Sequence, residues 1–195
     1  MALDKEYNTA ETPKKWQQFW EKTNLYRFNI DSGKQIFSID TPPPTVSGRL
    51  HIGHVSSYTQ TEVIARYKRM KGFEVFYPMC FDNNGLPTEL LTEKDHGVKA
   101  TDMSREDFNK LCTITSEKFV TQYSDIYKSL GFSCNWDEVY HSIDDRSQRV
   151  SQRSFIDLYN KGYVYPKEAP ALWCTKCQTS FAQAEVCLLY TSRCV

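Results

Sequence analysis

The stretch TPPPTVSGRLHIGH, residues 41–54, indicates the architecture of the chain, because it joins a predicted strand to a predicted helix. It follows QIFSID, residues 35–40, which is typical of a short buried strand. It precedes VSSYTQTEVIARYKRMKG, residues 55–72, which is typical of a helix ending at a glycine. The prolines stiffen the turn. A helix start exposes unpaired N–H groups and a partial positive charge, so it binds anions. The stretch therefore predicts a strand-to-helix turn that can hold a phosphate group.

Two histidines stand where this helix begins. His51 and His54 are three residues apart and share a face once the helix has started. Imidazole donates hydrogen bonds and can gain charge beside phosphate, and Gly53 leaves room for a flat group near the backbone. The same short pattern also occurs as two ordinary surface histidines. Metal binding is a further alternative, but no third ligand lies close in the sequence.

The next elements predict a parallel sheet. FEVFY, residues 73–77, is rich in strand formers, and we expect Pro78 to limit this strand. Strand, helix and strand in succession make a βαβ unit, which implies an α/β fold with a parallel sheet. Ligands of open α/β sheets bind beyond the carboxyl ends of the strands. Asp82 follows the second strand, so we expect its carboxylate at the same edge as the histidines.

An aspartate at that edge can hold an ammonium group by a charge-assisted hydrogen bond. The alternative is a turn aspartate, which is common before Asn-Gly, and we expect residues 80–91 to form a loop. The basic run at residues 66–71 is predicted to be a solvated helix face. It is less suited to RNA, because no aromatic side chains interleave with the basic ones.

Helices are predicted on both sides of this unit. Residues 12–24 form an amphipathic helix that we expect to dock on the main body, with Thr12 as its cap. A capping box at Ser104 and Asp107 opens a long helix whose apolar face is expected to include the following residues: Phe108, Leu111, Thr115, Phe119, Tyr123, Ile126 and Leu130. A further helix is expected over 144–161. The segments YVYP and ALW, residues 163–166 and 171–173, then predict short strands of a small β-rich module.

The composition points to a soluble, cytoplasmic protein with no membrane partner. Lys and Arg number 24, as do Asp and Glu, so net charge does not indicate a general polyanion binder. The N-terminus lacks an apolar signal core. The seven cysteines are scattered, unlike a secreted disulfide framework. Only Cys174 and Cys177 have motif spacing, which fits half of a zinc site, a redox pair without the usual βαβ context, or two plain cysteines.

The string PPPTVSGRLHIGH resembles the HIGH signature of the class I aminoacyl-tRNA synthetases. Residues 37–89 resemble the branch specific for valine, isoleucine and leucine. Within it, PPPTVSG, SYTQTEVIARYKRMKG and DNNGLPTE are most similar to the valine-specific family in its archaeal-type form, and the similarity runs from Tyr7 to Val186. The alternatives are an isoleucine or leucine enzyme, and a non-catalytic fragment that binds a nucleotide or RNA.

The resemblance implies an enzyme that joins valine to ATP, with Mg2+, and passes the valyl group to tRNA(Val). It implies that His51 and His54 contact the ATP phosphates as catalytic residues, with Ile52 and Gly53 completing the ATP site. It also implies an amino acid pocket made by four residues: Pro43, Pro44, Thr45 and Asp82. Many relatives have asparagine at the position of Thr45 and tryptophan at that of Phe81. The parent enzyme is expected to be monomeric, and Cys174 with Cys177 to be half of a zinc site.

Four regions follow from these expectations. They are an N-terminal helical arm (1–34), the first half of a Rossmann-like HIGH-type catalytic domain (35–165), the start of an inserted β-rich editing and zinc module (166–186) and a non-native tail (187–195). The sequence contains no second, KMSKS-type signature. We therefore expect a fragment of a longer ligase that has little or no aminoacylation activity by itself.

Overall fold

The structure is a computed structural model that describes residues 6–175 and 178–181. The chain divides into two compact units, residues 1–150 and 151–195, which are described separately. The elements of the first unit are, in chain order, α1 (Thr12–Thr23), β1 (Ile36–Ser38), α2 (Ile52–Met70), β2 (Glu74–Phe76), β3 (Pro78–Phe81), α3 (Leu86–His96), the 3-10 turn η1 (Ala100–Asp102), α4 (Arg105–Ser129) and β4 (Asn135–His141).

The second unit begins at Ser151, inside α5 (Asp145–Asn160), so this helix spans the boundary between the units. It then contains β5 (Leu172–Cys174) and β6 (Thr179–Phe181), which pair antiparallel. The predicted strand at 171–173 is confirmed as β5, whereas YVYP at 163–166 is not a strand. In the described part of the chain, no helix has the length and apolar character needed to cross a membrane.

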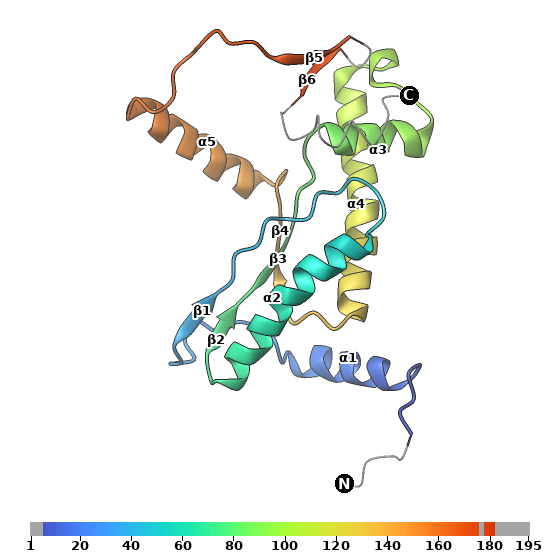
Figure 1. Cartoon of the computed structure of the whole chain (residues 1–195), viewed down its shortest axis with the longest axis vertical. Coiled ribbons are helices and arrows are strands. Elements are labelled where there is room, and N and C mark those ends of the chain that lie inside the picture. The colour runs from blue at the N-terminus through green and yellow to red at the C-terminus, as the bar shows by residue number, and fades with distance from the viewer. Residues whose placement is uncertain (1–5, 176–177, 182–195) are drawn as a thin grey trace. The chain divides into compact units, whose positions relative to one another are not determined.

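The predicted βαβ unit is confirmed, and with it the α/β class. β1 and β2 pair in parallel from Ile36 opposite Glu74 to Ser38 opposite Phe76, and α2 connects them (Figure 1). A second parallel pair joins β3 to β4, with α3 and α4 in the connection. The stretch from β2 through β3 therefore lies between β1 on one side and β4 on the other.

The strand predicted over 73–77 ends before Pro78, as expected, since β2 stops at Phe76, but a new strand that was not expected starts at Pro78. Proline lacks an N–H but is accepted at the first position of a strand. Here Pro78 opens β3, and the carbonyl of Tyr77 just before it accepts a hydrogen bond from Asn135 N at 2.7 Å. The loop expected over 80–91 is also shorter than predicted, because α3 begins at Leu86 with a proline in its first turn.

The helical arm is docked, as expected, although its cap is not Thr12. Glu11 is the N-cap residue and makes no side-chain capping bond. α1 contacts α4, and Gln17 Nε2 donates to the carbonyl of Ser129 at 2.8 Å. Trp20 lies under the guanidinium of Arg66, 5.2 Å from the ring centroid. Trp16 and Phe19, on the same face, stay about half exposed, so only part of the aromatic face is used.

Ser104 caps the long helix as expected, although the Asp107 carboxylate bonds to the Ser104 hydroxyl and not to Ser104 N as in a full capping box. Ser104 Oγ accepts from Asp107 N at 3.1 Å and donates to the carboxylate of Asp107 at 2.7 Å. Near the end of α4 the expected apolar face is wrong by one residue. Tyr127 is fully buried, whereas Ile126, which was expected on the buried face, is 38% exposed. The core gathers around these side chains, and its largest fully buried members are Tyr77, Phe81, Tyr123 and Tyr127.

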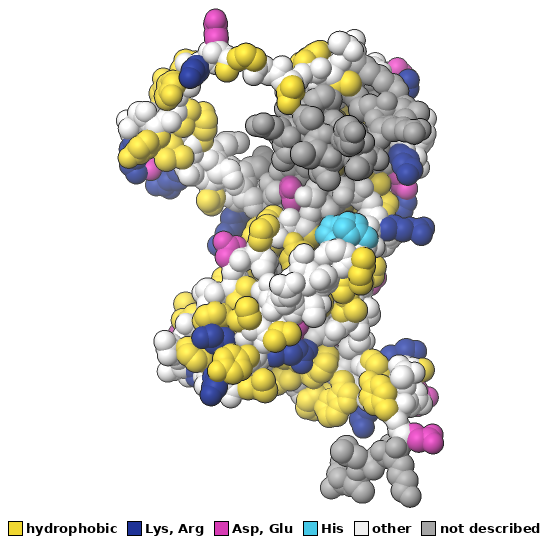
Figure 2. All heavy atoms as spheres, in the orientation of Figure 1, with side chains coloured by type: hydrophobic (Ala, Val, Ile, Leu, Met, Phe, Trp, Pro, Cys, Tyr) yellow, Lys and Arg dark blue, Asp and Glu magenta, His cyan; other side chains and the backbone are white. Residues whose placement is uncertain are grey.

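The basic run on α2 is not simply a solvated face. Arg66 donates to the carboxylate of buried Glu62 at 2.6 Å, and its other end reaches the Gly131 carbonyl. Glu62 also accepts from Ser133 N at 2.9 Å, while Arg69 donates to the Ser133 carbonyl at 2.7 Å. Two arginines of the run therefore tie α2 to the turn that starts β4. Figure 2 shows apolar and basic side chains together over this part of the surface.

Glu62→Ala is expected to lower the free energy of unfolding by about 3 kcal/mol, because it leaves Arg66 and Ser133 N without this acceptor. Urea denaturation followed by circular dichroism measures the loss. Glu106→Ala is the matched control, since Glu106 pairs with Lys110 at the same i,i+4 spacing but on the surface. The control should cost under about 0.5 kcal/mol. Equal losses for both variants would contradict this role of the network.

Candidate functional site

The two histidines open α2 and lie against each other. His51 is the N-cap residue, and its Nδ1 accepts from Gly53 N at 3.1 Å. His54 Nδ1 accepts from His51 N at 3.5 Å, and the ring centroids are 4.0 Å apart. The reciprocal bonds form a capping box built from imidazoles in place of the usual Ser and Glu. Histidine side chains are exposed at this end of α2 in Figure 2.

This capping fixes where the ring protons are. A neutral imidazole that accepts through Nδ1 carries its proton on Nε2. Burial lowers the pKa of His54, and the neighbouring His51 lowers it further, so His54 is neutral at pH 7. The Nε2–H groups are then left as donors beside the positive helix end. That combination suits an anion with several acceptor oxygens, such as phosphate.

Gly53 has a local reason to be glycine. A Cβ at this position would lie 3.0 Å from Cε1 and Nδ1 of His51, closer than side chains ordinarily approach. The residue therefore leaves room for the capping ring. Ile52, the remaining residue of the predicted ATP site, is 81% exposed at the first position of α2.

Asp82 lies where the sequence predicts it, against the proline turn. Asp82 N donates to the Pro44 carbonyl at 3.0 Å, and Val46 N donates to the Asp82 carbonyl at 2.8 Å. These bonds form a parallel bridge between Thr45 and Asp82. The Thr45 hydroxyl donates to Asp82 Oδ2 at 3.3 Å. Pro44 is buried and Pro43 is half-buried beside this bridge, so the four residues of the predicted amino acid pocket lie together.

Tyr123 lies beside both His54 and the bridge between Thr45 and Asp82. Its ring centroid is 6.1 Å from that of His54 and 6.4 Å from that of Phe81, which precedes Asp82. Its hydroxyl donates to the Thr45 carbonyl at 3.4 Å. Helical spacing predicts Tyr123 on the buried face of α4 but gives no sign of a role at the site. Phe81 is fully buried and stacks on His141 at 5.7 Å, as expected of a packing residue.

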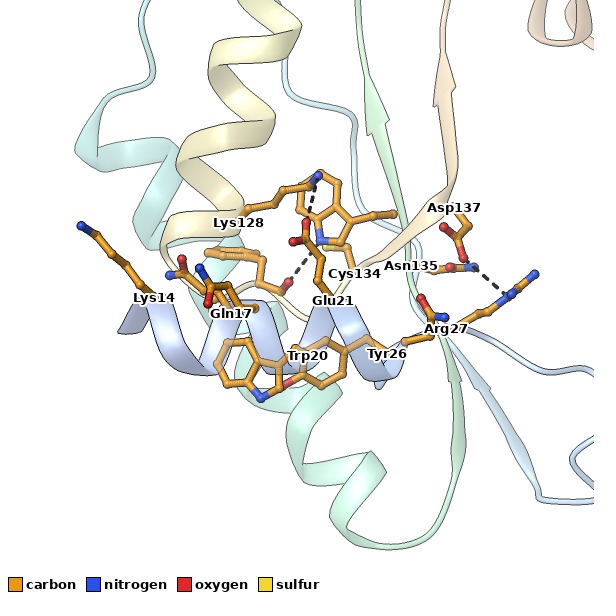
Figure 3. Close-up of a pocket in the computed structure, with 15 residues that line it drawn as sticks. Lys14, Gln17, Trp20, Glu21, Tyr26, Arg27, Lys128, Cys134, Asn135 and Asp137 are labelled. Carbon is orange, nitrogen blue, oxygen red and sulfur yellow. Dashed lines mark hydrogen bonds and ion pairs between the residues drawn. The ribbon is translucent and has the colours of Figure 1, made fainter. Parts of the chain in front are cut away.

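A hollow of about 420 Å³ lies elsewhere in the first unit, between α1, the end of α4 and β4 (Figure 3). Its rim carries the ion pairs Lys128–Glu21, 3.9 Å, and Arg27–Asp137, 3.5 Å, with largely exposed side chains. None of the predicted site residues lines it. We regard this hollow as part of the contact between the helical arm and the rest of the first unit, because the residues of the proline turn do not line it.

The predicted zinc half-site is not tested by the structure. Cys174 ends β5 and is half-buried, whereas Cys177 lies outside the described residues, as does the tail at 187–195. Within residues 6–175 and 178–181, no group of three or more His, Cys, Asp and Glu side chains could hold a metal ion.

The arrangement as a whole offers two kinds of recognition at one sheet edge. Imidazole donors at a helix start suit phosphate oxygens. The Asp82 carboxylate, beside the Thr45 hydroxyl, suits an ammonium group. A molecule with phosphates at one end and an amine at the other would satisfy both.

Most of the chain matches a known family and known proteins. Residues 15–192 match the family model of the class I tRNA synthetases (I, L, M and V). The chain is 48% identical over 184 residues to the valine–tRNA ligase of Ehrlichia canis (strain Jake), covering 94% of this chain and 23% of that protein. It is 45% identical over 183 residues to the valine–tRNA ligase of Rickettsia typhi, covering 93% and 22%. The chain thus spans about a fifth of the length of these relatives.

A solved structure shares the fold. LeuRS of Agrobacterium radiobacter K84, in a ternary complex with tRNA and LeuAMS, superimposes with a TM-score of 0.76 at 25% sequence identity. The match covers 93% of this chain and 21% of that one. With the family match over most of its residues, the chain belongs to the class I tRNA synthetases of the isoleucine, leucine, methionine and valine group.

Proposed function

We propose that this chain is the part of a valine–tRNA ligase that binds ATP and valine for adenylate formation. The observation that carries the proposal is the parallel bridge that sets Asp82 against the turn ending in His51 and His54. The relatives named valine–tRNA ligase, at 44% to 48% identity, favour valine as the amino acid.

In this proposal the amino acid carboxylate attacks the α-phosphorus of ATP, and pyrophosphate leaves. Asp82 holds the ammonium group of valine, with Pro43, Pro44 and Thr45 lining the same pocket. His51 and His54 donate to the phosphates, where negative charge must be stabilised, and Ile52 with Gly53 completes the ATP site. The protein therefore contributes alignment and charge stabilisation, with no covalent intermediate on a side chain. Mg2+ arrives bound to ATP and neutralises phosphate charge.

The second half-reaction passes the valyl group to tRNA(Val). From the family resemblance we also infer a monomeric, cytoplasmic ligase without a membrane partner, in which Cys174 and Cys177 form half of a zinc site. The names of the relatives support the ligase activity, and the spacing of Cys174 and Cys177 supports the half-site.

The experiment is valine-dependent pyrophosphate exchange by the full-length protein that carries these residues. His54→Gln should lower the exchange rate about 100-fold, because one donor to the developing phosphate charge is lost. Asp82→Asn should act mainly on the KM for valine, because the charge facing the ammonium is lost. His96→Gln, at a histidine of α3 that contacts Thr115, is the control and should stay within about twofold of wild type.

The same assay separates the candidate functions. Exchange with isoleucine or leucine in preference to valine would assign the chain to a ligase for that amino acid. Threonine should be activated measurably, because a hydrophobic pocket discriminates poorly against an isostere that adds a hydroxyl, as is known of valine–tRNA ligases. Tight ATP binding without exchange for any amino acid would instead favour a non-catalytic nucleotide-binding protein.

The isolated 195-residue chain is expected to show little or no exchange. The physical reason is that it has no KMSKS-type signature, so the lysines that this family uses to hold the triphosphate are missing from it. Pyrophosphate exchange on the purified chain, beside the full-length protein at equal concentration, measures the difference. A normal turnover number for the isolated chain would contradict the expectation.

A further inference from the structure

We propose that Ser142 is a positioning residue that orients the Asp82 carboxylate so that Oδ2 receives the ammonium group of the amino acid. The inference rests on the proposed function and adds a residue to it. Ser142 follows β4, which lies beside β3 in the sheet, so it reaches Asp82 from the side opposite to the proline turn.

The carboxylate of Asp82 is held from both sides. Oδ1 accepts from the Ser142 hydroxyl at 3.2 Å and from Asn84 N at 3.2 Å. Oδ2 accepts from the Thr45 hydroxyl at 3.3 Å. An ionised carboxylate has about four acceptor positions. Both acceptor positions of Oδ1 are occupied. Oδ2 accepts one hydrogen bond and therefore has a position left for a charged donor.

Ser142 is itself fixed, so its hydroxyl can act on Asp82. Ser142 N donates to the Phe81 carbonyl at 3.0 Å, which continues the β3–β4 pairing. Its Oγ accepts from Asn83 N at 2.8 Å. Because that bond uses a lone pair of Oγ, the hydroxyl proton is free to point at Asp82. One serine thus contacts three consecutive residues at the end of β3.

The turn that carries Ser142 is closed by Asp144. Its carboxylate accepts from Ser147 N at 2.6 Å and from His141 N at 3.0 Å. These backbone bonds lower the pKa of Asp144 to about 2, so the turn keeps its charged cap at neutral pH. His141 stacks on Phe81 and hydrogen bonds to Asn83 at 3.3 Å. The backbone of the turn is therefore held independently of the Ser142 hydroxyl.

The test is the KM for valine and the KM for ATP in pyrophosphate exchange by the full-length protein. Ser142→Ala should raise the KM for valine about tenfold and leave the KM for ATP within about twofold, because only the ammonium partner loses its orientation. Ser142→Thr keeps the hydroxyl and should restore the KM for valine. Ser151→Ala, at an exposed serine of α5, is the matched control.

Failure of this inference is distinguishable from failure of the proposed function. Absence of valine-dependent exchange in the wild type would remove the proposed function itself. With an active wild type, an unchanged KM for valine in Ser142→Ala would overturn the positioning role. So would equal increases for valine and ATP, or a Ser142→Thr variant as impaired as Ser142→Ala, since both indicate a merely structural serine.

A second variant covers the case in which Ser142→Ala does not fold. Ser142→Cys keeps a side chain of similar shape but replaces the hydroxyl by a thiol, which is a weak donor. Its KM for valine should rise while its KM for ATP stays near that of wild type. An unchanged KM for valine in Ser142→Cys would overturn the positioning role in the same way.

Discussion

The site depends on the pairing of one short turn with the end of one strand. Between Pro44 and Val46 the chain makes two backbone hydrogen bonds with Asp82, which extend the parallel pairing of β1 and β2 beyond the strands themselves. Prolines restrict the turn before this pairing, and α2 begins after it. Because the same turn touches Asp82 and leads into the histidines, the proposed phosphate end and amine end of the site are positioned together.

The helix start gives this turn its chemistry. His51 and His54 use Nδ1 to cap α2, which leaves Nε2 of each ring as the nitrogen available to a ligand. Donors that are already oriented need no rearrangement when negative charge develops, which is the basis of electrostatic catalysis. The capping role is therefore compatible with the proposed binding of phosphate, and Gly53 leaves space for the ring of His51.

The sequence predicted the parts of the fold that depend on local signals. The strand–turn–helix–strand order, the Ser104 cap and the meeting of Asp82 with the proline turn are confirmed. What it missed depends on contacts between distant segments. β4 has no clear alternation and pairs irregularly with β3. Arg66 bonds to the Gly131 carbonyl and Arg69 to Ser133, which lie 65 and 64 residues further along the chain. Ser142 gives no sequence signal because its role comes from the β3–β4 pairing.

The most direct measurement is a crystal structure of the full-length protein with a non-hydrolysable valyl-adenylate analogue. We predict the ammonium group within hydrogen-bond distance of Asp82 and the phosphate-equivalent group beside the Nε2 atoms of His51 and His54. An analogue whose ammonium is held by other residues, or whose phosphate equivalent lies away from the start of α2, would contradict the proposed division of the site into an amine end and a phosphate end.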